Sequence, residues 1–502
     1  MGNTILGANS PTGYDVTNSL RFNGANQYMH RTPSSTGSSL RATFSAWVKF
    51  NDTANEHALF GGWDDSGAND DDGYMVFYRA GGGRLVFKGG TDTYLQTNRL
   101  FLDTSAWYHI VLSIDSSQNS NNAQRLYVNG VEETSFYARS NLTNLQDLPM
   151  NTTAGNGDKI LIGADEDTGG VGMYFDGYMA DVFWIDNTQY AASNFGEYND
   201  DNVWIPKKGT QIASDLTMGT NGFFLEFQQT GTSANSSGIG ADTSGNDLHL
   251  TVAALGSNSP ALDVPTNNFC TMIPADNMNL SNGNISGATT RTGNWDAVHG
   301  SIGVTTGKWY FECRASRTED NFRVIVGVVG DPENWGIGFN GKGATGDPLS
   351  TFSNTYPFYG KGVWLSHWYD EDYNDSSTAS TQSNNDIIQI ALDMDNYKVW
   401  VGINGQFKDN SNNNVSYADV AAGNSATVTI ASAAYTGKTF FPAFWLRDDQ
   451  DQDDNLADIN FGGSISFNIS SAVADTAGRG RFEYTVPDGY YALCTKNLAA
   501  VG

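Results

Sequence analysis

The chain of 502 residues is poor in cysteine, in basic side chains and in long apolar runs. Its three cysteines are too few for a disulfide framework, and no cluster of His, Cys and Asp has zinc-site spacing. Lys and Arg number 27 against 55 Asp and Glu, and the resulting net charge of −28 repels phosphate backbones and anionic lipid. No apolar run approaches the ~18 residues of a membrane span. We therefore expect neither a nucleic-acid partner nor insertion into a membrane.

Helical patterns and a targeting signal are also missing. Long stretches of Ala, Leu, Glu and Lys at helical spacing do not occur, and the opening MGNTILGANSPTGYD lacks the basic and apolar regions of a signal peptide. What is abundant is 56 Gly, 27 Phe, 23 Tyr and 12 Trp among many Asn, Ser, Thr and Asp residues. This composition suits short strands joined by turns. The length predicts two or three domains.

Residues 1–205 show alternating strand patterns with no helical pattern between them, which predicts a sandwich or a barrel. In LRATFSAWVKF, Phe44, Ala46 and Val48 share one face and Trp47 lies on the other. The stretches that carry a family resemblance are FSAWVKF, WYHIVLSID, RLYVNGVE, ILIGAD and YFDGYMADVFWIDN. In this order they resemble the laminin-G-like, concanavalin A-type jelly roll, over roughly residues 16–200. The resemblance implies a lectin-like domain at 1–205.

Residues 206–280 are harder to place. GFFLEF and DLHLTV have the pattern of strands, whereas the polar stretches around them are punctuated by Pro206, Pro260, Pro265 and Pro274. Two interpretations are open, because this segment can complete the first sandwich or bridge to the next domain. We interpret it as a connector with some strand pairing.

A second β-domain is predicted over residues 281–502. In GKWYFECRA, Trp309, Phe311 and Cys313 alternate on one face, so Cys313 is interpreted as a core thiol. GKWYFEC, VIVGVV, IIQIALDMDNYKVWVGINGQF, FFPAFWL, INFGG and PDGYYALC resemble a SPRY domain in this order, although 369–386 is a polar insertion foreign to that family. The predicted fold is therefore all-β, with two antiparallel β-sandwich jelly rolls in tandem.

Two Asn-Gly pairs, Asn129-Gly130 and Asn404-Gly405, each follow an apolar run. Both residue types tolerate the positive φ of a type I′ turn, so each pair predicts a tight hairpin. The surrounding stretches, RLYVNGVE and KVWVGINGQF, differ from one another and match two different families. The repeated pair therefore indicates a shared turn and no internal duplication.

No catalytic constellation is found, and we expect that the protein is not an enzyme. A retaining glycoside hydrolase needs two carboxylates about 5 Å apart, and no Glu-x-Asp-x-(x)-Glu string occurs. GIGFNG (336–341) is followed by no helix, and TGKTF (436–440) lacks the first glycine of a phosphate loop. No Ser lies in a G-x-S-x-G elbow.

Calcium is the one cofactor that the sequence suggests, because hard oxygen ligands are crowded on three acidic loops. Laminin-G-like domains often carry calcium on a rim loop, which the resemblance implies for the second of these loops. The alternative is that the acidic loops only solvate the surface. The candidate ligands are Asp64, Asp65, Asp70 and Asp72, then Asp165 and Asp167, then Asp449, Asp451 and Asp453.

Aromatic residues are concentrated in 352–373, a stretch with little clean alternation. Rings in loops stack on sugar faces or on protein partners, and the alternative is that they cap the ends of the sandwich. The candidate ligand-binding residues are Tyr356, Trp364, Trp368 and Tyr369.

A laminin-G-like domain followed by a SPRY domain, at this composition, resembles structural proteins of tailed bacteriophages, especially marine ones. The resemblance implies a virion protein assembled in the host cytoplasm, with other capsid or tail proteins and host-surface carbohydrate as partners. We also expect a homo-oligomer. Three hypotheses stay open: a tail fibre, head fibre or decoration protein that attaches to host glycans; a purely structural virion protein without a glycan ligand; and, least favoured, a glycan-degrading enzyme.

Overall fold

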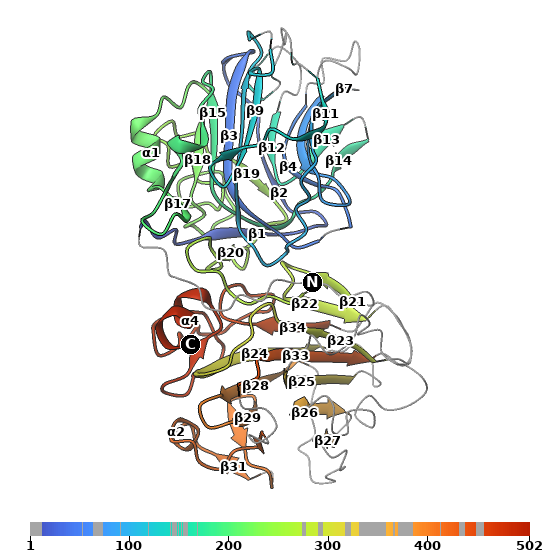
Figure 1. The fold of residues 1–502 in the computed structure, drawn as a ribbon, viewed down its shortest axis with the longest axis vertical. Coiled ribbons are helices and arrows are strands. Elements are labelled where there is room, and N and C mark those ends of the chain that lie inside the picture. The colour runs from blue at the N-terminus through green and yellow to red at the C-terminus, as the bar shows by residue number, and fades with distance from the viewer. Residues whose placement is uncertain are drawn as a thin grey trace. The chain divides into compact units, whose positions relative to one another are not determined.

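The computed structural model describes residues 13–502 apart from 53, 64–73, 91, 119, 141, 143–147, 149, 152, 154–158, 168, 274–277, 290–294, 317–322, 331–357, 365–366, 370–384, 412, 431–436 and 448–455. Two compact units divide the chain at residues 266 and 267 (Figure 1). Both consist mainly of antiparallel strands, which confirms the all-β prediction. No helix in the described part of the chain is long and apolar enough to cross a membrane.

The N-terminal unit, Pro11–Thr266, is a sandwich of two eight-stranded sheets. The order of the first sheet is β10 (Val131–Glu132), β9 (Gln124–Val128), β8 (Tyr108–Asp115), β3 (Arg41–Phe50), β15 (Asp176–Asp186), β1 (Ser19–Asn23) and β20 (Pro260–Ala261), with β18 (Phe223–Leu225) paired to β15. The order of the second sheet is β11 (Phe136–Arg139), β7 (Asp92–Thr97), β6 (Leu85–Gly89), β5 (Tyr74–Arg79), β4 (His57–Trp63), β12 (Lys159–Ile162), β2 (Tyr28–Arg31) and β19 (Thr251–Ala253).

Alternation along β3 shows how the sequence builds this sandwich. Phe44, Ala46 and Val48 point into the core between the two sheets, as predicted, whereas Trp47 packs in a separate cluster on the outer face of the first sheet. The core side chains of the two sheets meet at close aromatic contacts, such as Phe44 against Phe60 at 5.0 Å between ring centroids. The period of two residues therefore fixes which side chains enter the core.

The segment 206–266 belongs to the N-terminal unit, so it is part of that unit and does not stand apart as a connector. Its strands β18, β19 and β20 pair with β15, β2 and β1. Its helix α1 (Gly209–Asp215) contributes Ile212 to an apolar cluster on the outer face of the first sheet, where Phe183 and Phe224 stack at 4.0 Å. Of the predicted connector, 267–280 lies in the C-terminal unit.

A buried ion pair fastens the end of this segment to the first sheet. Lys49 Nζ, at the end of β3, lies 2.8 Å from Asp263 Oδ2, and both side chains are inaccessible to solvent. Trp107 Nε1 donates to Asp263 Oδ1 at 3.2 Å, and Ser19 Oγ donates to the Asp263 carbonyl oxygen. The pair therefore joins residues 214 positions apart.

We expect the change Lys49→Met to destabilise the protein by about 3–5 kcal/mol, because it leaves the Asp263 carboxylate buried without its cation. Arg41→Ala is the matched control, since Arg41 is 41% exposed in its ion pair with Asp115, and exposed pairs contribute less than about 1 kcal/mol. Chemical denaturation of both variants measures the difference. Equal losses in the two variants would contradict this assignment.

The C-terminal unit, from Asn267 to Gly502, holds two sheets. The order of the larger sheet is β21 (Met278–Ser281), β22 (Ser286–Thr289), β34 (Leu456–Asn460), β24 (Lys308–Ser316), β28 (Asp386–Asp393), β29 (Lys398–Ile403), β30 (Gln406–Lys408) and β31 (Asn414–Val415), with β32 (Val428–Thr429) on β29 and β35 (Tyr491–Ala492) on β24. The order of the smaller sheet is β23 (Trp295–His299), β33 (Phe440–Arg447), β25 (Arg323–Gly330), β26 (Phe358–Trp364) and β27 (His367–Tyr369). Helices α2 (Tyr417–Ala421) and α4 (Thr495–Val501) are short.

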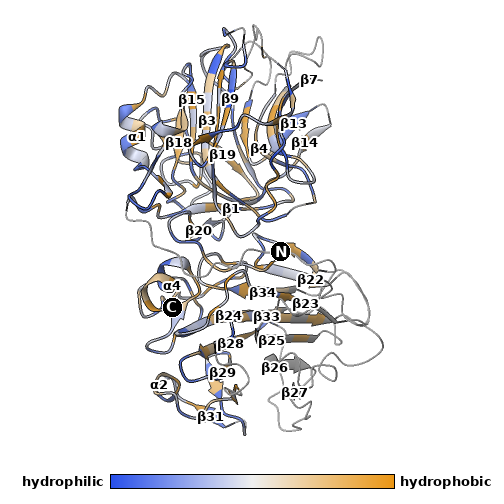
Figure 2. Cartoon of the chain, in the orientation of Figure 1, coloured by the Kyte–Doolittle hydropathy of each residue, from blue (hydrophilic) through white to orange (hydrophobic). Residues whose placement is uncertain are grey.

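The core of this unit lies between β24 and β33, which Figure 2 colours as hydrophobic along much of β33. Trp309, Phe311 and Cys313 all point into it, which confirms the prediction of a core thiol. Burial raises the pKa of the Cys313 thiol well above its usual range, so the thiol stays protonated. The other face of β24 carries Glu312, whose carboxylate accepts hydrogen bonds from the backbone N–H groups of Glu483 and Tyr484 at 3.0 and 2.9 Å.

Both Asn-Gly pairs form the predicted tight turns. Asn129 and Asn404 have φ of 49° and 46°, and the glycines that follow have φ of 81° and 84°. Asn129 Oδ1 accepts from the N–H of His109 at 2.8 Å, and Asn404 Oδ1 accepts from the N–H of Ile387 at 2.9 Å. In both turns the asparagine side chain therefore extends the ladder to the neighbouring strand.

Candidate functional site

The predicted aromatic site lies at the edge of the smaller C-terminal sheet. Strands β26 and β27 form an antiparallel hairpin in which Val363 pairs with Trp368 and Gly362 with Tyr369, and Trp364 pairs with His367. The backbone therefore brings Trp364, Trp368 and Tyr369 to one hairpin. Tyr356 lies outside the described residues. Ligand binding by these four residues stays a prediction.

Of the predicted calcium ligands, only Asp165 and Asp167 lie within the described residues. They sit on β13 (Asp165–Asp167), which forms a hairpin with β14 (Gly170–Gly172). Asp165 is buried, and Asp167 Oδ1 accepts the N–H of Gly169 at 2.7 Å, so it closes the turn of its own hairpin. The described residues contain no group of three or more His, Cys, Asp or Glu that could hold a metal ion.

The other two predicted calcium loops, with Asp64, Asp65, Asp70 and Asp72 and with Asp449, Asp451 and Asp453, lie outside the described residues. Calcium takes six to eight oxygen ligands, which carboxylates, backbone carbonyls and water can supply, so calcium at Asp165 and Asp167 stays a prediction. Calcium at the two remaining loops also stays a prediction.

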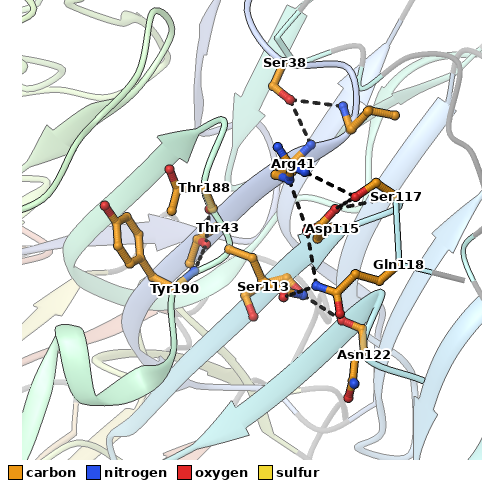
Figure 3. Close-up of polar contacts among 12 residues, drawn as sticks. Ser38, Arg41, Thr43, Ser113, Asp115, Ser117, Gln118, Asn122, Thr188 and Tyr190 are labelled. Carbon is orange, nitrogen blue, oxygen red and sulfur yellow. Dashed lines mark hydrogen bonds and ion pairs between the residues drawn. The ribbon is translucent and has the colours of Figure 1, made fainter. Parts of the chain in front are cut away.

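A polar network closes one end of the first sheet (Figure 3). We call it the polar rim: Arg41, Asp115, Ser117, Gln118, Asn122 and Gln189. Arg41 Nε lies 3.1 Å from Asp115 Oδ2, which also accepts from Gln118 Nε2 at 3.1 Å. Gln118 Nε2 then donates to Gln189 Oε1 at 3.0 Å.

The residues of the polar rim bond mainly to one another and to nearby backbone groups. Hydrogen bonds from Ser117, Gln118 and Arg41 hold the pKa of Asp115 below its usual range, so Asp115 stays charged against Arg41. Gln189 Nε2 donates to the carbonyl oxygen of Asn122 at 2.8 Å, which ties the segment after β15 to the turn after β8. Because its charges are already paired, the rim is better suited to holding the fold than to recruiting a ligand.

Two carboxylates meet on the outer face of the first sheet, where the sequence indicated none. Asp181 has φ of 46° at a bulge in β15, and the register Val182↔Leu225 places Glu226 beside it. Both side chains are buried, and Asp181 Oδ2 has no hydrogen-bond partner among the described residues. Burial, and next the charge of Glu226, raise the pKa of Asp181 to about 8. Their burial leaves no surface on which a saccharide could reach them.

We expect the stability of the wild-type protein to fall between about pH 4 and pH 8, because folded Asp181 keeps a proton that the unfolded chain has released. The change Asp181→Asn should remove this slope and leave the variant more stable at pH 8, on the order of a few kcal/mol. Denaturation at a series of pH values measures it. Glu226→Gln should flatten the slope in part, and parallel curves for all three proteins would contradict the assignment.

An exposed aromatic side chain marks the edge of the second sheet. Tyr137 on β11 is 69% exposed, the largest value among the exposed large hydrophobic and aromatic side chains of the described residues. The guanidinium carbon of Arg84 lies 4.7 Å from the centre of its ring and covers one face of it. Among the described strands, β11 pairs only with β7 and lies at the end of the sheet order (Figure 1). The other face of the ring is therefore open to solvent. The backbone that carries the ring is held by strand pairing.

Two exposed leucines lie in a segment that bonds to the backbone beside Arg84 and just before β11. Leu100 and Leu102 are 46% and 49% exposed. The neighbouring Phe101 donates its N–H to the Gly83 carbonyl at 2.7 Å, next to Arg84, and Asn98 donates to the Ser135 carbonyl at 3.2 Å. We call Arg84, Leu100, Leu102 and Tyr137 the tyrosine platform. Sequence reasoning missed it, since the stretch SFYARS carries no signal beyond one aromatic pair.

Comparison of sequences agrees with the architecture of the N-terminal unit. Residues 23–189 match the family model of the concanavalin A-like lectin/glucanases superfamily. They form a concanavalin A-like domain. This confirms the predicted concanavalin A-type resemblance for residues 23–189, and the tyrosine platform lies within them. No curated protein matches the chain in sequence.

Solved structures resemble parts of the chain at low identity. A candidate carbohydrate-binding protein from Bacteroides ovatus is 15% identical at a TM-score of 0.31, and the match covers 47% of this chain and 58% of that protein. A SAP-like pentraxin from Limulus polyphemus is 13% identical at 0.26, covering 36% and 80%. The SPRY domain of human HERC1 is 14% identical at 0.23, covering 38% and 96%. Likeness at this level carries no inference about ligands.

Proposed function

We propose that the concanavalin A-like domain is a lectin-like module that binds glycans at the tyrosine platform. The observation that carries this proposal is the exposure of Tyr137 on a paired strand with one ring face covered by Arg84. A sugar ring presents a flat face of C–H groups that packs on an open aromatic face, while its hydroxyl groups bond to nearby polar groups. The superfamily, which includes lectins, supports the proposal.

The size of the platform sets the strength of binding. Covering about 50 Å² of apolar ring surface contributes on the order of 1 kcal/mol, and a few hydrogen bonds add about 1 kcal/mol each. Because association also costs translational and rotational freedom, a single platform gives at best an affinity near the millimolar range, which corresponds to about −4 kcal/mol. Attachment to a surface then requires several copies acting together, and this is the reason to expect a homo-oligomer.

We propose that the module acts on a virion, as a tail fibre, head fibre or decoration protein that attaches to host-surface glycans. The support is the sequence resemblance of the domain pair to structural proteins of tailed bacteriophages, together with a net charge of −28, which disfavours nucleic-acid binding. Electron microscopy of particles with this protein labelled tests the proposed location on a virion, whatever the ligand is.

A purely structural role is the second candidate, because Leu100 and Leu102 are the kind of side chains that protein partners cover. In that case the platform would contact capsid or tail proteins and no sugar. Stoichiometric recovery with capsids and a blank glycan array would select this role. Turnover of a host polysaccharide would instead select an enzyme, which we do not propose.

We expect the change Tyr137→Ala to weaken glycan binding about fivefold, because it removes the stacking surface. Folding should be retained, since the side chain is exposed. Tyr198→Ala is the matched control: Tyr198 is 48% exposed, and its ring lies against Trp204 away from any arginine contact that the described residues make.

Binding to a glycan array, followed by calorimetry on the best ligand, measures the effect in both variants. Unchanged binding by the Tyr137 variant, or an equal loss in the Tyr198 variant, would remove the platform from the binding site. Thermal unfolding curves of both variants confirm that any loss of binding is not a loss of fold.

A further inference from the structure

Two ion pairs of the N-terminal unit have almost the same length and very different surroundings. Lys159 Nζ lies 2.7 Å from Glu166 Oε1, and the two side chains are 28% and 17% exposed. Lys49 Nζ lies 2.8 Å from Asp263 Oδ2, and these side chains are 0% and 1% exposed. Bulk water therefore reaches the first pair and does not reach the second.

Aromatic rings lie beside the buried pair and orient it. The register Tyr178↔Lys49 between β15 and β3 places the Tyr178 ring next to the amine, with 5.6 Å between Nζ and the ring centroid. Trp107 lies just before β8, and its ring centroid is 6.2 Å from that of Tyr178. Its Nε1–H donates to Asp263 Oδ1 at 3.2 Å. The two carboxylate oxygens therefore have different partners, with the amine on Oδ2 and the indole on Oδ1.

We propose that Lys49 and Asp263 condense to an amide, so that the N-terminal unit cross-links itself covalently. Transfer of one proton from Nζ to Oδ2 gives an amine and a carboxylic acid, and removes two buried charges at once. Nζ then attacks Cγ of Asp263, and the Trp107 N–H stabilises the negative charge that develops on Oδ1. A second proton passes from Nζ to Oδ2, the Cγ–Oδ2 bond breaks, and Oδ2 leaves as water.

The fold supplies what the same condensation lacks in water. Two groups held in contact and in a fixed orientation react as if at an effective concentration on the order of 10⁵ M or more. The enclosure that keeps bulk water from the pair also slows hydrolysis of the amide once it has formed. Because the reaction only exchanges protons and releases one water, it requires no oxidant and no cofactor.

The position of the pair gives the bond its consequence. It joins residues 214 positions apart, from the end of β3 to the last residues of the N-terminal unit. A covalent link that closes so long a loop constrains the unfolded chain and so stabilises the folded one. The segment that covers the outer face of β15 could then no longer separate fully from β3. This inference is independent of glycan binding at the tyrosine platform.

The test measures the mass of the full chain under denaturing conditions. We expect the folded and incubated protein to be lighter than its sequence by the mass of one water molecule. Digestion with trypsin should yield one branched peptide that contains both Lys49 and Asp263. Lys159 and Glu166 are the matched control, because their ion pair is equally short but exposed. Their side chains should be recovered without a cross-link.

Two variants separate the reacting groups from the group that assists them. Lys49→Arg keeps a cation beside Asp263, but a guanidinium does not lose its proton and so offers no free amine. This variant should therefore have the full mass of its sequence. Trp107→Phe keeps a ring and removes the donor to Oδ1, so cross-linking should be slower by about tenfold or more. A time course of the mass after cell-free synthesis measures this rate.

Each outcome supports or overturns the amide. Wild-type protein that keeps the full mass of its sequence after prolonged incubation in the folded state would overturn it and leave an ordinary buried ion pair. Loss of water with the branch at any other pair of residues would overturn it as well. If Lys49→Arg fails to fold, the mass and the branched peptide of the wild-type protein still decide. An unchanged rate in Trp107→Phe would remove the indole from the reaction.

Discussion

Strand β15 is buried along all eleven of its residues, and most of the N-terminal unit is arranged to achieve this burial. Its inner face, with Met179, Val182 and Trp184, packs between the two sheets. Its outer face carries Phe183 and Ile185, which a sandwich of two sheets would leave in water. A strand that is apolar on both faces must be covered on both faces. The chain therefore returns over the outer face of β15 with α1, β18 and the segment that ends at Asp263.

This constraint explains why a buried ion pair and a buried acid pair lie on the same outer face. Once a covering layer exists, any polar group beneath it loses water and needs a partner. Lys49 pairs with Asp263, with 2.8 Å between Nζ and Oδ2. Asp181, at the bulge of β15, lies beside the like charge of Glu226 and keeps a proton instead. Both solutions follow from covering the strand, and neither lies on the tyrosine platform.

The sequence predicts what depends on neighbouring residues and misses what depends on pairing across the fold. Alternation places Phe44 and Trp47 on opposite faces correctly, and Asn129 and Asn404 form their turns as expected, because periodicity and positive φ are local properties. The bond between Lys49 and Asp263 depends on register between segments 214 positions apart. No local pattern in the sequence predicts such a long-range contact. For the same reason, sequence reasoning interprets 206–280 as a connector.

The candidate site shows the same limit. The stretch SFYARS does not by itself predict that Tyr137 is exposed. β11 is an edge strand with a bulge between Phe136 and Ala138. Phe136 packs toward the core, and Tyr137 points into solvent. Arg84 reaches that ring from the turn before β6, across β7. The exposed backbone groups of an edge strand can pair with another chain, and proteins usually prevent this with charged side chains. Here the guanidinium of Arg84 covers one face of the Tyr137 ring, so charge lies at this edge while the other face of the ring stays available for the proposed glycan.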